Sequence, residues 1–161
     1  NNANICLMKC KIISISHKPS DWEKKALDFY LKQIPNNVKL SFAEVKPLAA
    51  KSLSQEEIVR NESLEILHQI DQTAFVILWD RKGDLISSES LAKLFQKKID
   101  LTQNVNMIIG GAYGVSSELL TKADLVLSAS HLTFPHRLFK ILLMEQIFRA
   151  CAINRSHPYH K

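Results

Sequence analysis

The 161-residue sequence is poor in the residues that mark several classes of protein. It has three cysteines, Cys6, Cys10 and Cys151, which are too few and too scattered for a disulfide framework, and no Cys-x-x-Cys pair that would indicate zinc. No stretch approaches the roughly 18 uninterrupted apolar residues that a membrane span needs. The N-terminus also lacks the charged start, apolar core and cleavage site of a secretory signal. We therefore expect a reduced, cytoplasmic protein with no bound metal and no membrane partner.

Composition and charge favour a folded domain that binds nucleic acid. Hydrophobic residues make up 46% of the chain and charged residues 23%, which is ordinary for a soluble domain and excludes disorder of the whole chain. The formal net charge of +5 is weak evidence alone, but residues 131–161 hold five basic side chains, one acid and four of the six histidines. This basic end predicts a surface for phosphate, with a purely solubilising role as the alternative.

Strand-like and helix-like segments alternate along the chain. Residues 1–7 have no pattern, and we interpret them as an extension ahead of a natural start at Met8, which leaves residues 8–161 as a single domain. Buried or β-branched runs predict strands at about 11–16, 39–45, 74–79, 105–109 and 125–128. Capping signals and apolar periodicity predict helices at about 21–34, 55–70, 88–100, 117–122 and 136–154. The predicted fold is therefore α/β, with a mainly parallel sheet flanked by helices.

The helix expected at 136–154 is apolar in nearly every direction. A helix that is apolar all round must be buried all round, so we expect its own sheet to cover one side and a second subunit to cover the other. Glu145 and Arg149 lie one turn apart on it, in the acid-first order that favours pairing. Both an ordinary structural ion pair and a role in a functional site stay open for these two residues.

Three segments carry a concentration of functional groups. Gly110-Gly111-Ala112-Tyr113-Gly114 follows a buried strand, so its backbone N–H groups lie at the carboxyl end of a parallel sheet, where α/β proteins bind ligands. This loop is neither a P-loop nor a Gly-x-Gly-x-x-Gly fingerprint, and a purely structural turn is the alternative. The connection 128–136 combines hydroxyls, a proline and two imidazoles, and the C-terminal run 154–160 adds two histidines and a tyrosine. The sequence shows no zinc-ligand spacing and no nucleophile elbow.

Four motifs in these segments and the last helix carry a specific resemblance: Ile109-Gly110-Gly111-Ala112-Tyr113-Gly114, Leu132-Thr133-Phe134-Pro135-His136, Phe148-Arg149-Ala150 and His157-Pro158-Tyr159-His160. In this order and spacing, over Met8 to Lys161, the sequence resembles the bacterial family of ribosomal RNA large subunit methyltransferase H. The resemblance implies a SPOUT-class enzyme that uses S-adenosylmethionine to methylate N3 of a pseudouridine in 23S ribosomal RNA, within the assembled ribosome. It also implies a homodimer and a C-terminal trefoil knot, a topology that no sequence periodicity can show.

By the same resemblance, the cofactor contacts fall at Trp79, Gly110, Ala129, Ser130, His131, Leu132, Thr133 and Phe134. Trp79 stands where the family commonly has leucine, and its indole either tightens stacking on the adenine or refills the sheet. We expect a valine at position 110 to block the cofactor while leaving the fold largely intact, because a branched side chain would fill the space where backbone meets ligand.

The candidate catalytic residues are Arg149, His157, Tyr159 and His160. N3 of pseudouridine must lose a proton before or during attack, and an imidazole suits that task near neutral pH. His157 and His160 are therefore the candidate bases. We expect Tyr159 to place or stack on the target base, and Arg149 to stabilise the developing imidate or to hold a phosphate. Which of them moves the proton stays open.

Two other functions fit the sequence. A non-catalytic RNA-binding or ribosome-associated module would account for the basic C-terminal end, but it would not require the glycine loop or the motif at 132–136. A SPOUT methyltransferase that acts on tRNA would differ only in its substrate. Binding of the methyl donor separates the first alternative from the enzyme, and mapping of the methylated nucleotide separates the second.

Overall fold

The computed structural model describes residues 7–49 and 51–160, and its centre is a five-stranded sheet in the order β2-β1-β4-β3-β5. The strands are β1 (Met8–Ile15), β2 (Val38–Val45), β3 (Phe75–Leu85), β4 (Val105–Ile109) and β5 (Leu125–Ser128), and they pair in parallel throughout the sheet. The helices are α1 (Asp21–Leu31), α2 (Gln55–Gln69), α3 (Ser88–Asp100), α4 (Ser117–Lys122) and α5 (His136–Asn154), followed by the 3-10 turn η1 (Pro158–His160). The predicted α/β fold with a mainly parallel sheet is confirmed, and the trefoil knot stays a prediction.

The expected N-terminal extension and the expected single domain are only partly covered by the described residues. Of the expected N-terminal extension, residues 1–6 lie outside the described residues, and the exposed Leu7 directly precedes β1. The single domain expected over residues 8–161 stays a prediction. No helix in the described part of the chain is long and apolar enough to cross a bilayer.

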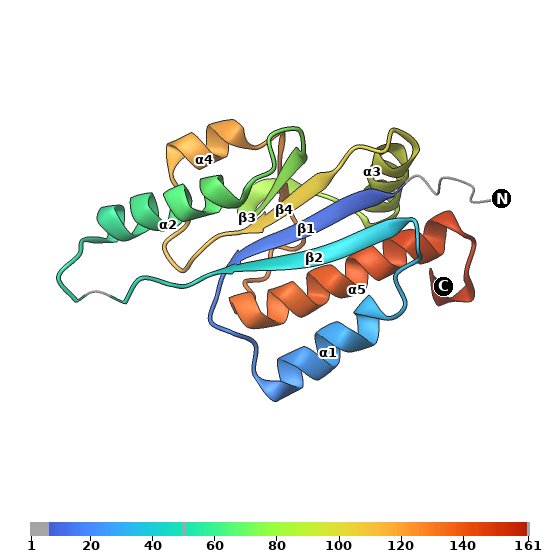
Figure 1. The fold of residues 1–161 in the computed structure, drawn as a ribbon, viewed down its shortest axis with the longest axis horizontal. Coiled ribbons are helices and arrows are strands. Elements are labelled where there is room, and N and C mark those ends of the chain that lie inside the picture. Colours follow the sequence, from blue (N-terminus) through green and yellow to red (C-terminus); the bar gives the residue numbers. More distant parts are fainter. Residues whose placement is uncertain (1–6, 50, 161) are drawn as a thin grey trace.

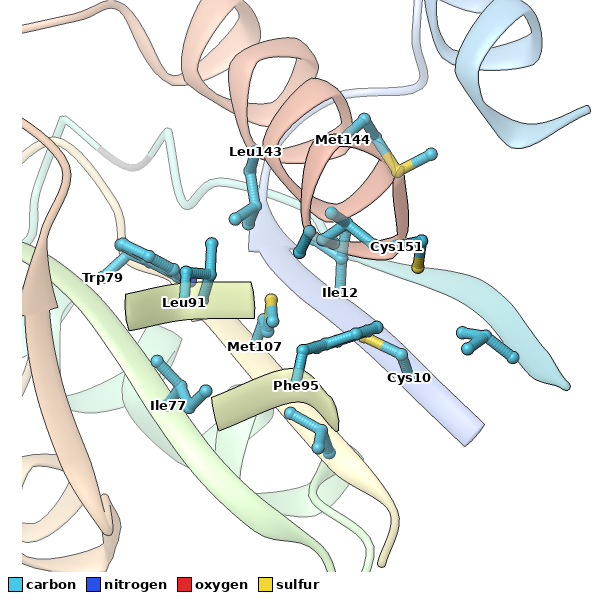
Figure 2. Packing of buried hydrophobic residues seen from close by; sticks show 14 of the residues in the cluster. Cys10, Ile12, Ile77, Trp79, Leu91, Phe95, Met107, Leu143, Met144 and Cys151 are labelled. Atoms are coloured by element: carbon cyan, nitrogen blue, oxygen red, sulfur yellow. The ribbon is translucent and has the colours of Figure 1, made fainter. Parts of the chain in front are cut away.

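Helices cover both faces of the sheet (Figure 1), and two hydrophobic clusters lie beneath them. Successive strand residues point to opposite faces. Ile12 of β1 and Met107 of β4 therefore belong to the cluster under α1, α3 and α5, which Figure 2 shows from close by. Ile13 and Ile108, their neighbours in the chain, belong to the cluster under α2 and α4. The strands β1 and β4 in the interior of the sheet thus contribute apolar side chains to both clusters, as expected of a parallel sheet covered on both faces.

Local signals in the sequence set the starts of the first two helices. The N–H of Ser20 donates to Oε2 of Glu23 at 2.7 Å at the start of α1, and the N–H of Ser54 donates to Oε2 of Glu57 at 2.8 Å at the start of α2. Both predicted capping boxes are therefore confirmed. The two helices lie on opposite faces of the sheet, with Leu27 of α1 in one cluster and Ile66 of α2 in the other.

β3 is longer than predicted, because it continues past Trp79 to Leu85. Its register against β5 shifts between Trp79 and Asp84, so the ladder is interrupted and then resumes. Gly83 permits this return, since a Cβ there would lie only 2.7 Å from the backbone of Leu127 on β5. The polar composition of residues 80–85 gave no strand signal, and tertiary pairing alone makes them one.

The bounds predicted for the last helix are confirmed, since α5 runs from His136 to Asn154. The prediction that one subunit cannot cover this helix is wrong. α5 lies against the sheet with α1 and α3 packed beside it, so a single chain already buries most of its apolar side chains, Phe148 among them. Leu138, 41% exposed, is the large apolar side chain of α5 that stays open. The homodimer loses this support and stays a prediction.

Candidate functional site

A cleft of about 750 Å³ opens at the carboxyl ends of β3, β4 and β5. Three chain segments that are far apart in the sequence form most of its wall: 79–82, 109–115 and 126–134 without His131. Leu120, His136 and Phe139 complete the lining. Ligands of parallel α/β proteins bind at this edge of the sheet, where strands end and helices begin.

The glycine loop forms one wall of the cleft through its backbone. The N–H of Gly114 donates to the carbonyl of Gly111 at 3.1 Å, and Gly114 has a φ of 87°, which glycine adopts without strain. A Cβ on Gly110 would lie 2.7 Å from Cγ1 of Val115. A valine at position 110 would therefore have to displace the side chain of Val115 within the loop, and that the fold stays largely intact remains a prediction.

The segment after β5 forms the opposite wall, and its own serines hold its shape. Ser128 Oγ donates to the carbonyl of Ser130 at 3.0 Å, and the N–H of Leu132 donates to Ser130 Oγ at 2.9 Å. Of the eight residues predicted to contact the cofactor, all except His131 line the cleft. The structure thus brings three predicted segments to one place, while their contact with a cofactor stays a prediction.

Trp79 forms part of the wall between the cleft and a smaller cavity of about 200 Å³, which lies between α3, α5 and the segment after β5. Its ring meets that of Phe139 edge-on with centroids 5.9 Å apart, and Figure 2 shows it beside Leu91. The side chain is buried, and its Nε1–H has no acceptor among the described residues.

His136 lines the cleft, although the sequence assigned it only to the start of α5. Burial lowers the pKa of its imidazole, and the carboxylate of Glu62 partly opposes this effect. The ring is therefore neutral at pH 7 and can accept a hydrogen bond or a proton. A signal for this role was present in the sequence, because His136 ends the same motif that supplies the cleft residues from Leu132 to Phe134.

Two of the predicted catalytic residues, Arg149 and Tyr159, meet around the carboxylate of Glu145 in the middle of α5. Its Oε1 accepts from Arg149, at 2.9 Å from Nε and 2.6 Å from Nη2, and from the hydroxyl of Tyr159 at 3.2 Å. Its Oε2 accepts from Nε2 of Gln146 at 2.6 Å. The ring of Tyr159 also packs on Phe148, with centroids 4.5 Å apart. The predicted ion pair of Glu145 and Arg149 is confirmed, and Tyr159 is its third member.

The turn after α5 folds the C-terminal segment back onto the helix. The N–H of His157 donates to the carbonyl of Ala152 at 2.8 Å, and the N–H of Tyr159 donates to Nδ1 of His157 at 3.3 Å. Burial first, and then the nearby Glu145 carboxylate, raise the pKa of the Tyr159 hydroxyl. This hydroxyl is therefore protonated at neutral pH and acts as a donor.

The predicted catalytic residues and the predicted cofactor residues occupy different parts of the chain. Arg149, His157 and Tyr159 are not among the described residues that line the cleft. Nine helical positions separate His136 in the cleft from Glu145, a distance of about 13 Å along the helix axis. His160 lies in η1, and its side chain falls outside the described part of the structure. The structure does not bring the two predicted sets together within one chain.

A parallel sheet with a glycine turn and a cleft at its carboxyl edge defines an α/β protein that holds a small molecule by backbone and apolar contacts. The family model described as "Predicted SPOUT methyltransferase" matches residues 8–160. Three relatives named Ribosomal RNA large subunit methyltransferase H come from Alkaliphilus oremlandii (38% identical, covering 96% of this chain and 100% of the relative), Clostridium kluyveri (37%, 96% and 100%) and Dechloromonas aromatica (32%, 96% and 99%). The chain belongs to the SPOUT methyltransferase family and is a methyltransferase.

Proposed function

We propose that the protein transfers a methyl group from S-adenosylmethionine to N3 of a pseudouridine in large-subunit ribosomal RNA, on the assembled ribosome in the cytoplasm. Relatives that match over nearly the whole chain and are named for large-subunit ribosomal RNA support this substrate. The observation that carries the proposal is the convergence of Trp79, Gly110 and residues 129–134 on one cleft. A module that only binds RNA has no need for such a cleft.

The cleft fits the cofactor in size and in chemistry. Its volume of about 750 Å³ lies within the roughly 300–1,000 Å³ of small-molecule sites. Leu127, Phe134 and Phe139 supply apolar surface for the adenine, and the glycine loop supplies backbone N–H and C=O groups. Asp80 and Lys82 add charges of both signs for the amino-acid end of the cofactor. The bound S-adenosylmethionine would supply an activated methyl group, and these residues would bind and orient it.

The acceptor nitrogen must lose its proton, and the contacts of each candidate residue favour some of them over others as the base. The hydroxyl of Tyr159 has a raised pKa and donates a hydrogen bond to Glu145, so we assign it to placing the substrate and not to taking the proton. Arg149 already shares that carboxylate, which favours a part in ordering the C-terminal segment. His157 and His160 stay the proposed bases, and the neutral His136 in the cleft is a further candidate.

We propose that the active enzyme is a homodimer, because the C-terminal segment does not line the cleft of its own chain as far as the structure describes it. A second copy can bring Tyr159 and its neighbouring histidines to the cleft. Large apolar side chains are exposed on two helices that pack side by side, namely Trp22 and Phe29 on α1 and Leu138 on α5. An exposed apolar surface of this kind favours a partner. The trefoil knot belongs to the same proposal.

Two measurements test the proposed function. Calorimetry with S-adenosylmethionine measures binding to the cleft. Incubation with methyl-labelled cofactor and, in separate reactions, assembled ribosomes, naked large-subunit RNA or tRNA is followed by mass mapping of the product. We expect N3-methylpseudouridine in the large-subunit RNA of assembled ribosomes. Methylation of tRNA alone would overturn the ribosomal substrate, and a folded protein that binds no cofactor would favour a non-catalytic RNA-binding module.

A further inference from the structure

Glu62 is a buried carboxylate behind the glycine loop, and the proposed reaction leaves it without a role. It lies in α2, is 5% exposed, and its Oε1 accepts from the N–H of Leu48 at 3.1 Å. The other oxygen, Oε2, faces Gly111 so closely that a Cβ on this glycine would overlap it. Because Gly111 lines the cleft, the carboxylate sits directly behind the cleft wall.

Among the described residues, no cation forms an ion pair with this carboxylate. Glu23, which is similarly buried, lies 3.8 Å from Arg137, whereas no basic side chain in the described part of the chain forms an ion pair with Glu62. His136 is the titratable cleft residue on which Glu62 acts, and its lowered pKa keeps it neutral at pH 7. A buried charge without a partner is costly. The fold thus keeps a negative charge at the cleft wall that a cationic ligand would offset.

We infer, on the basis of the proposed function, that Glu62 makes the cleft selective for the cationic methyl donor over its demethylated product. Methyl transfer breaks the bond between the methyl carbon and sulfur, forms a bond from carbon to nitrogen, and leaves the electron pair of the broken bond on sulfur. A sulfonium thereby becomes a neutral thioether. The attraction of the carboxylate favours the donor before transfer and is lost from the product afterwards, which promotes product release.

The substitution Glu62→Gln isolates the charge. Glutamine keeps the size of the side chain and an oxygen that accepts from the N–H of Leu48. An attraction between two unit charges across a protein wall is screened much less than in bulk water, with an effective dielectric constant of about 20, so removing one charge should change the affinity measurably. Calorimetry with S-adenosylmethionine and with S-adenosylhomocysteine measures the two affinities separately. We expect Glu62→Gln to weaken binding of the sulfonium about tenfold and binding of the thioether less than about twofold.

A matched control separates this effect from the loss of a buried carboxylate in general. Glu23→Gln removes a carboxylate that is equally buried but already paired with Arg137, so the ratio of the two affinities should stay at its wild-type value. Glu62→Asp keeps the charge and shortens the side chain, so it should also keep that ratio. Thermal unfolding of each variant shows whether it is folded under the conditions of the titration.

The outcomes distinguish the inference from the proposed function. Equal weakening of both ligands by Glu62→Gln, or an unchanged ratio, would show that Glu62 only supports the loop. A wild-type protein that binds neither ligand would refute the proposed function itself. If Glu62→Gln does not fold, an analogue with an ammonium in place of the sulfonium decides the matter in the wild type. Binding no tighter than that of the thioether would overturn the inference.

Discussion

Replacing Glu145 with alanine removes the acceptor that holds the C-terminal segment on α5. The carboxylate, 14% exposed, accepts two hydrogen bonds from Arg149, one from Tyr159 and one from Gln146. A hydrogen bond to a charged group contributes about 1.5–3 kcal/mol, and an exposed ion pair one helical turn apart about 0.3–0.5 kcal/mol. The cluster around Glu145 is only partly buried, so we expect its loss to lower the free energy of unfolding by an intermediate amount, about 1–2 kcal/mol. For a chain of 161 residues the melting temperature should fall by about 2–8 °C.

Tyr159→Phe is the matched variant, because it removes one hydrogen bond of 3.2 Å and keeps the ring on Phe148. Its cost should be smaller, about 0.5–1 kcal/mol. Thermal unfolding measures both variants, and hydrogen exchange at the amides of His157, Tyr159 and His160 reports whether the segment detaches. We expect faster exchange in Glu145→Ala. An unchanged melting temperature together with unchanged exchange would refute the reasoning, because ring packing on Phe148 and the backbone bond from His157 to Ala152 would then suffice to hold the segment.

Four further predictions use the same protein. Leu138→Glu should reduce the mass in light scattering from twice 18.3 kDa to the single chain without unfolding it, because this side chain is exposed in one chain; a wild type of 18.3 kDa would reject the homodimer. The pKa of His136 lies below its ordinary 6.5, so its share of stability is present above that pH and is lost as the pH falls through the lower value; His136→Gln should remove this part of the acid loss in a melting series. Gly110→Val should lower both the melting temperature and cofactor affinity, whereas Gly114→Ala meets no atom and should cost only about 1 kcal/mol for its positive φ. Deletion of residues 157–161 should abolish RNA methylation and spare most of the cofactor affinity; loss of both would assign the segment a structural role.

The parts of the fold that follow from nearest neighbours were predictable. The run from Val105 to Ile109 is apolar except for Asn106 and forms a strand buried on both faces. Ser54 and Glu57 form the capping box that their spacing predicted. The end of β3 was not predictable, because residues 80–85 are polar and become a strand only through their contact with β5. That α1 and α3 bury most of α5 within one chain could not be predicted for a similar reason. A helical wheel shows where apolar side chains lie but not which helices flank them.

In the candidate site too, residues in local sequence motifs were predictable, whereas contacts created only by the fold were not. The glycine loop and the segment at 129–134 carry motifs in consecutive residues, so the sequence predicted them together. Glu62 has no local motif, and its importance comes from the contact of its carboxylate with Gly111, which only the fold creates. The spacing of Glu145 and Arg149 predicted their ion pair, but nothing in it indicated that the Tyr159 hydroxyl would join them.

Charge is distributed over the molecule in a way that suits a donor whose own charge changes during the reaction. The cleft walls are mostly backbone and apolar surface, which would bind an adenine in either charge state equally well. By the inference above, the Glu62 carboxylate behind one wall distinguishes the two states by charge. The Tyr159 hydroxyl is bonded to Glu145 and is not part of the cleft lining. Donor selection by Glu62 and the proposed placing of the substrate by Tyr159 therefore depend on different elements, so each can be removed by substitution while the other is measured.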